Sequence, residues 1–304
     1  MKNFLIQETL LIDHMNRSNI DLNIALAIDE NYITPSGVLI FSILQNNENL
    51  NIHFHIFTTS KDLDKFNHFL DFKTKITLYI LNESYFSSLQ TPGHFSSAIY
   101  YRIAIPTILF EKIDKILYVD ADILCVNNLK ELSSVDITHF YLAAVEDLEM
   151  KQSDKLSLGI TEKYFNSGVM LINIEKWIKE DIFTQFMELV NKNVYKYPDQ
   201  DALNILFKNN VYYLSSKYNH FTEKDSNNAN LIHYVGALKP WSMASENNEM
   251  YLQYYNSSPF KNIALQIPNT HKIAKKLSKK YLKNKRYSKA IQWYFIYIIM
   301  KIKK

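Results

Sequence analysis

Two aspartates separated by one residue, Asp120 and Asp122, have a type and spacing that suggest chemistry. On a turn, both carboxylates can direct their oxygens at one divalent cation whose other ligands are phosphate oxygens. Carboxylate and diphosphate oxygens suit Mg²⁺ or Mn²⁺, and an added histidine ligand would favour Mn²⁺. An Asp-x-Asp triplet also arises by chance as a solvated turn, so the pair alone does not establish a metal site.

A second cluster, residues 232–241 (IHYVGALKPW), contains groups that suit a diphosphate. His233 could complete the metal site, Gly236 would let the backbone approach closely, and Lys239 would place a positive charge on phosphate. Taken by itself, the segment could equally be a strand followed by a surface loop. Its occurrence together with the aspartate pair gives the diphosphate interpretation its weight.

Two further segments contain polar residues that could have a function. In residues 164–173 (YFNSGVMLIN), Asn166 could present its amide to sugar hydroxyls, although an ordinary turn entering a core strand would look the same. In residues 198–204 (PDQDALN), acidic residues begin a helix, where they are favoured. Capping explains the aspartates of this segment but hardly explains Gln200 as well.

The surrounding apolar runs predict strands that alternate with helices. Strands are expected at residues 23–28, 52–57, 76–80, 115–119, 142–145, 168–172 and 231–233. Helices are expected at 38–44, 62–72 and 98–108, from residue 175 and at 201–207, with a loop at 84–94. Such alternation indicates an α/β sheet with helices on both faces. The aspartate pair follows strand 115–119 directly and therefore lies at a carboxyl edge, where open α/β sheets bind ligands.

The composition is that of a globular protein with an ample core. The chain has 304 residues, of which 47% are hydrophobic and 14% aromatic, which excludes disorder and collagen. A single cysteine, Cys125, cannot form an internal disulfide, and no stretch of about 20 apolar residues could span a membrane. Charged residues interrupt what would be an apolar signal core in residues 1–23. These features favour a cytoplasmic protein.

The net charge of +3 conceals an asymmetry along the chain. Twelve of the 34 basic residues, and no acidic residue, lie from Lys272 onward, so residues 1–271 hold 22 basic against 31 acidic residues. The net negative charge of residues 1–271, the body of the chain, argues against nucleic acid binding there. Basic residues at helical spacing over 272–289, followed by aromatic and apolar residues, predict an amphipathic tail on an anionic membrane surface. The tail could instead be a solvated helix packed on the domain, or bind RNA.

Taken together and in this order, these segments resemble glycosyltransferase family 8, particularly its lipopolysaccharide core α-galactosyl- and α-glucosyltransferases. The resemblance covers most of the chain up to about Asn262. Its motifs are LNIALAIDENY at 22–32, HFHIFT at 53–58, YR at 101–102, LYVDAD at 117–122, FNSG at 165–168, DQD at 199–201 and HYVGALKPW at 233–241. The resemblance implies a GT-A fold, in which a Rossmann-like mixed sheet is flanked by helices. It also implies transfer of a hexose from a UDP-sugar with retention of the anomeric configuration.

By position, the resemblance implies roles for residues throughout the chain. The metal ligands, for Mn²⁺ or Mg²⁺, would be Asp120, Asp122 and His233. Uridine and diphosphate would be bound by Asp29, Asn31, Gly236 and Lys239. The donor sugar would be surrounded by Arg102, Asp147, Asn166, Asp199 and Gln200. The domains would be an N-terminal extension at 1–21, the GT-A domain at 22–268 and a basic amphipathic tail at 269–304.

The implied partners are a UDP-hexose donor, a glycolipid core oligosaccharide acceptor and the inner face of the cytoplasmic membrane, with no nucleic acid. No carboxylate stands out as a covalent nucleophile at Gln200, which favours front-face attack by the acceptor hydroxyl. Three alternatives stand beside this interpretation: another glycan or a protein as acceptor, a non-catalytic nucleotide-sugar-binding protein, and a metal phosphohydrolase. The joint presence of the metal and diphosphate residues argues against the non-catalytic protein. A two-metal hydrolase would need a second cluster rich in His and Asp, which the sequence lacks.

Overall fold

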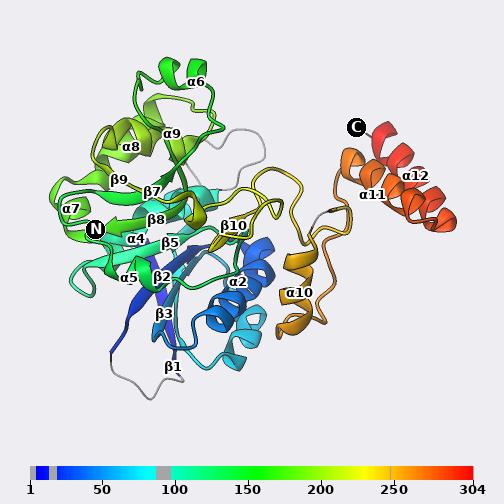
Figure 1. Cartoon of the computed structure of the whole chain (residues 1–304), viewed down its shortest axis with the longest axis horizontal. Helices are drawn as coiled ribbons and strands as arrows, with labels where there is room; N and C mark the ends of the chain where they lie inside the picture. Colours follow the sequence, from blue (N-terminus) through cyan, green and yellow to red (C-terminus); the bar gives the residue numbers. More distant parts are fainter. Residues whose placement is uncertain (1–4, 14–18, 87–96, 247, 304) are drawn as a thin grey trace.

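The structure is a computed structural model that describes residues 5–13, 19–86, 97–246 and 248–303. Its centre is a mixed sheet of eight strands in the order β1-β4-β3-β2-β5-β8-β7-β9 (Figure 1). These strands are β1 (Ile6–Asp13), β2 (Leu22–Ala27), β3 (Ile52–Thr58), β4 (Lys75–Leu81), β5 (Lys115–Val119), β7 (Leu142–Glu146), β8 (Phe165–Asn173) and β9 (Val211–Leu214). Two short strands, β6 (Ile123–Cys125) and β10 (Leu231–His233), form a separate antiparallel pair.

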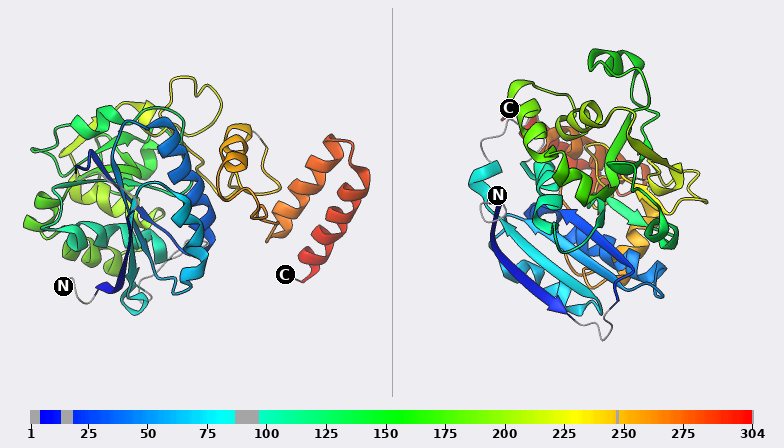
Figure 2. Two further views of the ribbon diagram at one scale, coloured as in Figure 1. Left: turned by 90° about the horizontal axis from the view of Figure 1, so that it is seen from below. Right: turned by 90° about the vertical axis from the view of Figure 1, so that its left-hand side faces the viewer.

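Alternate residues of the central strands enter two different hydrophobic clusters, as the two-residue period of a strand requires. In β2, Ile24 and Leu26 belong to one cluster and Ala25 to the other, and in β5 Leu117 and Tyr118 divide in the same way. The first cluster is completed by α2 (Ile33–Asn46) and α10 (Glu249–Ser257), and the second by α4 (Tyr101–Leu109), α7 (Ile174–Lys179), α8 (Ile182–Lys192) and α9 (Pro198–Phe207). Figure 2 shows this sheet between its helices, which confirms the predicted α/β architecture.

The strand order creates a switch point at one edge of the sheet. β2 pairs in parallel with β3, which follows it in the chain, and also with β5, which comes much later. The chain therefore leaves β2 and β5 at the same edge but continues in different directions, which is the arrangement that opens a ligand crevice in α/β sheets. β8 pairs antiparallel with β5 and brings Gly168 beside this edge.

Part of the predicted N-terminal extension, residues 1–21, is a strand of the sheet. Residues 6–13 form the edge strand β1, which pairs antiparallel with β4, so this part of the extension belongs to the sheet. The segment IQETLLID shows no clear alternation, because all eight of its residues are exposed or half-buried on an edge strand. Residues 1–4 and 14–18 lie outside the described residues, and the other domain boundaries remain predictions.

Several local predictions differ from the structure. The helix expected at 62–72 is the 3-10 helix η2 (Leu63–Asp71), and the Asn-Ser-Gly segment lies within β8 rather than in a turn before it. The helix expected at 98–108 is divided into η3 (Ser97–Tyr100) and α4. The loop expected at 84–94 begins inside α3 (Glu83–Phe86), and residues 87–94 lie outside the described residues. Elements without a prediction are β1, β6, β9, η1 (Glu30–Tyr32), α5 (Lys130–Ser134), α6 (Gln152–Ser157), η4 (Ser216–Tyr218) and α10.

The basic C-terminal segment folds as two helices, α11 (His271–Lys283) and α12 (Tyr287–Ile302), which form a hairpin that projects from the body (Figures 1 and 2). Ala274, Leu277 and Ala290 are buried in it, and the Ser278 hydroxyl donates to the Ala290 carbonyl at 2.8 Å. The helical C-terminal extension is thus confirmed. Among the described helices, none has the length and apolar character needed to cross a membrane.

Candidate active site

Asp120 and Asp122 flank the turn between β5 and β6. The Asp120 N–H donates to the Gly168 carbonyl at 2.8 Å, and the Ile123 N–H donates back to the Asp120 carbonyl at 3.2 Å. Because β5 is buried and paired on both sides, by β2 and β8, the start of this turn is fixed by the centre of the sheet. The pair therefore lies in a turn at the carboxyl edge of β5, as predicted.

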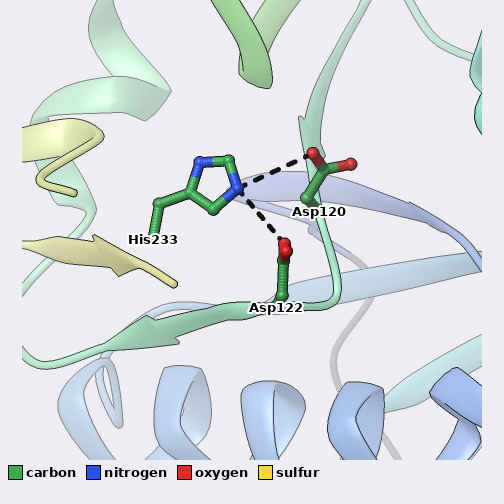
Figure 3. Close-up of side chains that lie close together, drawn as sticks. All are labelled: Asp120, Asp122 and His233. Atoms are coloured by element: carbon green, nitrogen blue, oxygen red, sulfur yellow. Dashed lines mark ion pairs between the residues drawn. The ribbon is translucent and has the colours of Figure 1, made fainter. Parts of the chain in front are cut away.

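His233 reaches the aspartates through the small antiparallel pair of strands. β10 pairs with β6 so that His233 lies opposite Ile123, and the Tyr234 N–H donates to the Asp122 carbonyl at 3.0 Å. The His233 Nε2 atom consequently lies 3.2 Å from Asp122 Oδ1 and 4.0 Å from Asp120 Oδ2. Figure 3 shows the three side chains converging.

The geometry of this cluster fits one divalent cation. Ligand atoms about 2.1 Å from a common octahedral ion lie about 3 to 4.2 Å apart, and the two His233 distances of 3.2 and 4.0 Å fall in that range. One ligand atom from each of the three residues lies within 4.8 Å of the other two. Two carboxylates and an imidazole are a donor set that suits Mn²⁺ or Mg²⁺.

The orientation of His233 is fixed by two neighbours. The Asn219 Oδ1 atom lies 2.9 Å from His233 Nδ1 and accepts a hydrogen bond from it, which leaves Nε2 as the ring nitrogen directed at the aspartates. Gly168 lies directly against the ring: a Cβ atom at this position would lie 2.8 Å from His233 Nδ1 and closer still to Cε1. Any side chain at residue 168 would therefore displace the imidazole.

The charges of the two aspartates are controlled by different neighbours. Burial by itself would raise the pKa of Asp122, but His233 and Lys239 beside its carboxylate hold that pKa below its ordinary value. Burial raises the pKa of Asp120, and the Arg102 guanidinium opposes this effect. Asp122 is therefore the more firmly ionised of the two carboxylates.

Lys239 enters the cluster from an exposed loop that begins after β10. Its Nζ atom lies 2.5 Å from Asp122 Oδ2 and donates to the Tyr234 carbonyl at 3.0 Å. Gly236 adopts a φ of 91°, in the left-handed region that favours glycine, and so lets the loop turn back toward the site. The assignment of Gly236 and Lys239 to a diphosphate remains a prediction.

A buried chain of amide groups joins the metal cluster to three of the predicted donor-sugar residues. Asn219 donates to Asn166 Oδ1 at 2.8 Å, and Asn166 donates to Gln200 Oε1 at 2.9 Å. Gln200 in turn donates to Asp147 Oδ2 at 3.2 Å. His233, Asn166, Gln200 and Asp147 therefore lie along one hydrogen-bonded path.

Arg102 forms a second connection between the metal cluster and the donor-sugar residues. Its guanidinium lies 2.8 Å from Asp120 Oδ1 through Nη2 and 3.0 Å from Asp199 Oδ2 through Nη1. The Ser167 hydroxyl also donates to Asp199 Oδ2, at 3.0 Å. Because Arg102 is only 7% exposed, the two carboxylates are held together by a buried charge.

The predicted uridine-binding residues lie on the neighbouring strand end. Asp29 and Asn31 follow β2, and the Asn31 N–H donates to Asp29 Oδ1 at 2.9 Å at the start of η1. The rings of Tyr32 and Trp241 form a T-shaped contact, with 5.4 Å between their centroids. Burial, followed by the charge of Asp122, raises the pKa of Tyr32 above its ordinary value. The uridine role of Asp29 and Asn31 remains a prediction.

Three residues of this arrangement were missed by the sequence analysis, namely Tyr118, Ser167 and Asn219. Tyr118 looks like an ordinary residue of an apolar strand, although it lies two residues before Asp120 and its hydroxyl donates to that carboxylate. Ser167 directly follows Asn166, which had been singled out, and its hydroxyl was the available signal. Asn219 follows the 3-10 helix η4 with no local motif, so its role emerges only from the fold.

Comparison with known proteins places this site in a family. The model of "Glycosyl transferase family 8" matches residues 23–245, and that of "Glycosyl transferase family 8 C-terminal" matches residues 247–301. The chain is 32% identical to the lipopolysaccharide glucosyltransferase WaaO of Escherichia coli, in an alignment that covers 100% of both chains. It is 30% identical to a lipopolysaccharide 1,3-galactosyltransferase of Salmonella typhimurium over 98% of this chain and 97% of that one.

Solved structures agree with this relationship. The galactosyltransferase LgtC, in complex with donor and acceptor sugar analogs, superposes with a TM-score of 0.71 at 28% identity, covering 82% of this chain and 98% of LgtC. The bifunctional glycosyltransferase WbbM shares the fold, with a TM-score of 0.68 at 22% identity, over 81% of this chain and 52% of WbbM. The predicted GT-A fold is thereby confirmed. The sequence motifs, the two family models and the structural match agree, and the chain belongs to glycosyltransferase family 8.

Proposed function

We propose that this family 8 glycosyltransferase moves glucose or galactose from UDP to a lipopolysaccharide core acceptor, with retention of configuration and with Mn²⁺ or Mg²⁺ as cofactor. The observation that carries the proposal is the convergence of Asp120, Asp122 and His233, which hydrogen bonds and ion pairs join to all five predicted donor-sugar residues. Relatives aligned over nearly their whole length are named for glucosyl and galactosyl transfer to lipopolysaccharide. They support a hexose and this acceptor without choosing between the two sugars.

The side chains of the site suit the departure of a nucleoside diphosphate. A divalent cation in the cluster would neutralise negative charge that develops on the diphosphate. Lys239 adds a second positive charge beside Asp122, in a position fixed before the reaction. Asp199, held in place by Arg102 and Ser167, supplies a fixed negative charge near the proposed sugar position, where an oxocarbenium-like centre would develop.

The same contacts favour front-face attack over a covalent intermediate. Asp199 Oδ2 is engaged by Arg102 and by Ser167, each at 3.0 Å, which makes this oxygen a poor nucleophile. The acceptor oxygen would attack the anomeric carbon from the same side as the departing diphosphate. The bond from that carbon to the diphosphate oxygen would break as the new bond forms. The acceptor proton would pass to a diphosphate oxygen, and the configuration would be retained.

The hairpin α11–α12 supports a location on the inner face of the cytoplasmic membrane. Nine basic residues lie within 272–289, and α12 exposes a row of large apolar side chains at helical spacing: Tyr287, Ile291, Tyr294, Phe295, Ile299 and Ile302. Phe295 and Ile302 are 61% and 79% exposed. Positive charge beside exposed aromatic rings suits an anionic lipid interface, where a glycolipid acceptor would be found.

The decisive experiment measures UDP release from UDP-glucose and UDP-galactose with Mn²⁺, in the presence and absence of a truncated core glycolipid. We expect one donor to be consumed, release to increase on addition of the glycolipid, and a chelator to stop both. Undiminished release with chelator would refute the metal dependence. Stimulation by a protein or an unrelated glycan in place of the core glycolipid would refute the proposed acceptor.

A further inference from the structure

The two carboxylate oxygens of Asp120 have different surroundings. Oδ1 accepts hydrogen bonds from the Tyr118 hydroxyl at 2.5 Å and from Arg102 Nη2 at 2.8 Å. Oδ2 lies 4.0 Å from His233 Nε2, on the side of the proposed cation. Figure 3 shows one oxygen of Asp120 turned toward His233 and the other turned away. One oxygen is thus committed to buried partners, while the other is directed at the cluster.

Tyr118 is held firmly in the position from which it donates this hydrogen bond. Its side chain is fully buried on β5, and its ring lies 4.6 Å from the Arg102 guanidinium carbon, in a cation–π contact. Arg102 is anchored further by the Ser167 carbonyl at 3.1 Å and by Asp199 at 3.0 Å.

We propose that Tyr118 is a positioning residue which, together with Arg102, makes Asp120 a one-oxygen ligand and thereby sets the cation preference of the site. This inference rests on the proposed metal dependence. A carboxylate whose Oδ1 is occupied by two donors cannot chelate an ion through both oxygens. Mg²⁺ requires a small octahedral shell, whereas Ca²⁺ accepts carboxylates that bind through two oxygens. The hydroxyl of Tyr118 therefore favours the smaller ions over Ca²⁺.

The substitution Tyr118→Phe tests this role because it keeps the ring over Arg102 and removes only the hydroxyl. Binding is measured without turnover, at saturating UDP, from the electron paramagnetic resonance signal of free Mn²⁺, with Mg²⁺ and Ca²⁺ as competitors. We expect the affinity for Mn²⁺ and Mg²⁺ to fall about tenfold, as for other groups that orient a metal ligand. The affinity for Ca²⁺ should fall less or rise, so the ratio of the Ca²⁺ to the Mg²⁺ dissociation constant should fall at least about threefold.

The matched control is Tyr79→Phe. Tyr79 is also a buried strand tyrosine, 2% exposed, and its hydroxyl contacts His55 Nδ1 at 3.2 Å rather than a proposed metal ligand. This variant should bind all three cations like the unaltered protein. Thermal unfolding of each variant reports whether loss of the hydroxyl has affected the fold.

An unchanged ratio in Tyr118→Phe would overturn the proposal, whether the affinities are intact or all three fall equally. If Tyr118→Phe does not fold, Arg102→Lys serves as the second variant, because it removes the guanidinium that donates to Asp120 Oδ1. The ratio of the Ca²⁺ to the Mg²⁺ dissociation constant should again fall, and an unchanged ratio would overturn the proposal. An unaltered protein that binds no divalent cation would refute the proposed function itself, and this inference with it.

Discussion

The active site and the C-terminal hairpin differ in how far their charged side chains are exposed to solvent. At the site, Arg102, Asp120, Asp122 and Asp199 are largely buried, and each lies within 3.2 Å of an oppositely charged or hydrogen-bonding partner. In the hairpin, most basic side chains are exposed, and an ion pair of 3.8 Å, between Lys283 and Glu246, joins it to the body. The site is an enclosed network, whereas the hairpin is a charged surface.

The difference determines how each region responds to change. Removing one member of a buried network leaves its partners without compensation, so the effect is large and hardly depends on salt. An exposed lysine near a lipid surface contributes about 1 kcal/mol, which salt screens and which neighbouring lysines share. We therefore expect single substitutions to act strongly at the site and weakly in the hairpin.

The largest effect is expected for Asp122→Asn, which preserves the shape of the side chain and removes its charge. His233 and Lys239 both contact this carboxylate, so the variant loses a cation ligand and the partner of the half-buried Lys239. We expect UDP release to fall at least about a thousandfold, since a catalytic cation supplies several kcal/mol. Asp154→Asn is the control, because the Asp154 carboxylate contacts Lys196 and Ser153 at the surface rather than a residue of the site. Full activity in Asp122→Asn would contradict the metal assignment.

Removal of the hairpin should have the next largest effect, and on a different property. A chain ending at Asn269 lacks all twelve basic residues that lie from Lys272 onward. If several of them contact the membrane, binding to anionic vesicles should weaken at least about a hundredfold. Release of UDP from soluble donor should persist, because none of the site residues lies in the hairpin.

Vesicle sedimentation checks this prediction, with neutral vesicles as the control for charge. Equal binding of the full and shortened chains would contradict a membrane role for the hairpin. Displacement of the full chain from anionic vesicles by RNA, at equal ionic strength, would favour the RNA alternative instead.

The third prediction compares a methyl group added at the site with one added in the hydrophobic core. Gly168→Ala places a methyl group against His233, and Gly37→Ala places one against the ring of Phe260 in the hydrophobic core. Both should lower the free energy of unfolding by about 1–3 kcal/mol, the usual cost of overpacking. Only Gly168→Ala should also weaken Mn²⁺ binding, by about tenfold, because it moves a ligand. Equal Mn²⁺ affinity in the two variants, measured by calorimetry, would show that His233 tolerates displacement.

The same contrast explains what the sequence could predict. β5 and β10 were predicted with the bounds that the structure has, because their apolar runs are short and end at polar residues. Asp120, Asp122 and His233 were identified because metal chemistry restricts residue type and because the family motifs surround them. β1 escaped prediction because an exposed edge strand needs no regular apolar pattern.

The supporting residues of the site could not be found in this way. Asn219 acts on His233 across a gap of fourteen positions, and Tyr118 has the appearance of any buried strand residue. Their roles depend on β10 pairing with β6 and on α4 placing Arg102 over β5, which are properties of the whole fold. A local sequence pattern does not contain that information.

The smallest effect is expected for Lys276→Gln, a change of one exposed charge in α11. At about 1 kcal/mol for a lysine near an anionic leaflet, the vesicle partition coefficient should fall about fivefold at low salt and less at physiological salt. Lys61→Gln removes an exposed charge from the acidic body and should leave the partition coefficient unchanged. Because both variants keep the site intact, UDP release from soluble donor should equal that of the unaltered protein. If Lys61→Gln weakened vesicle binding as much as Lys276→Gln, attachment would depend on the net charge of the chain, and the contrast between an enclosed site and a membrane-facing hairpin would fail.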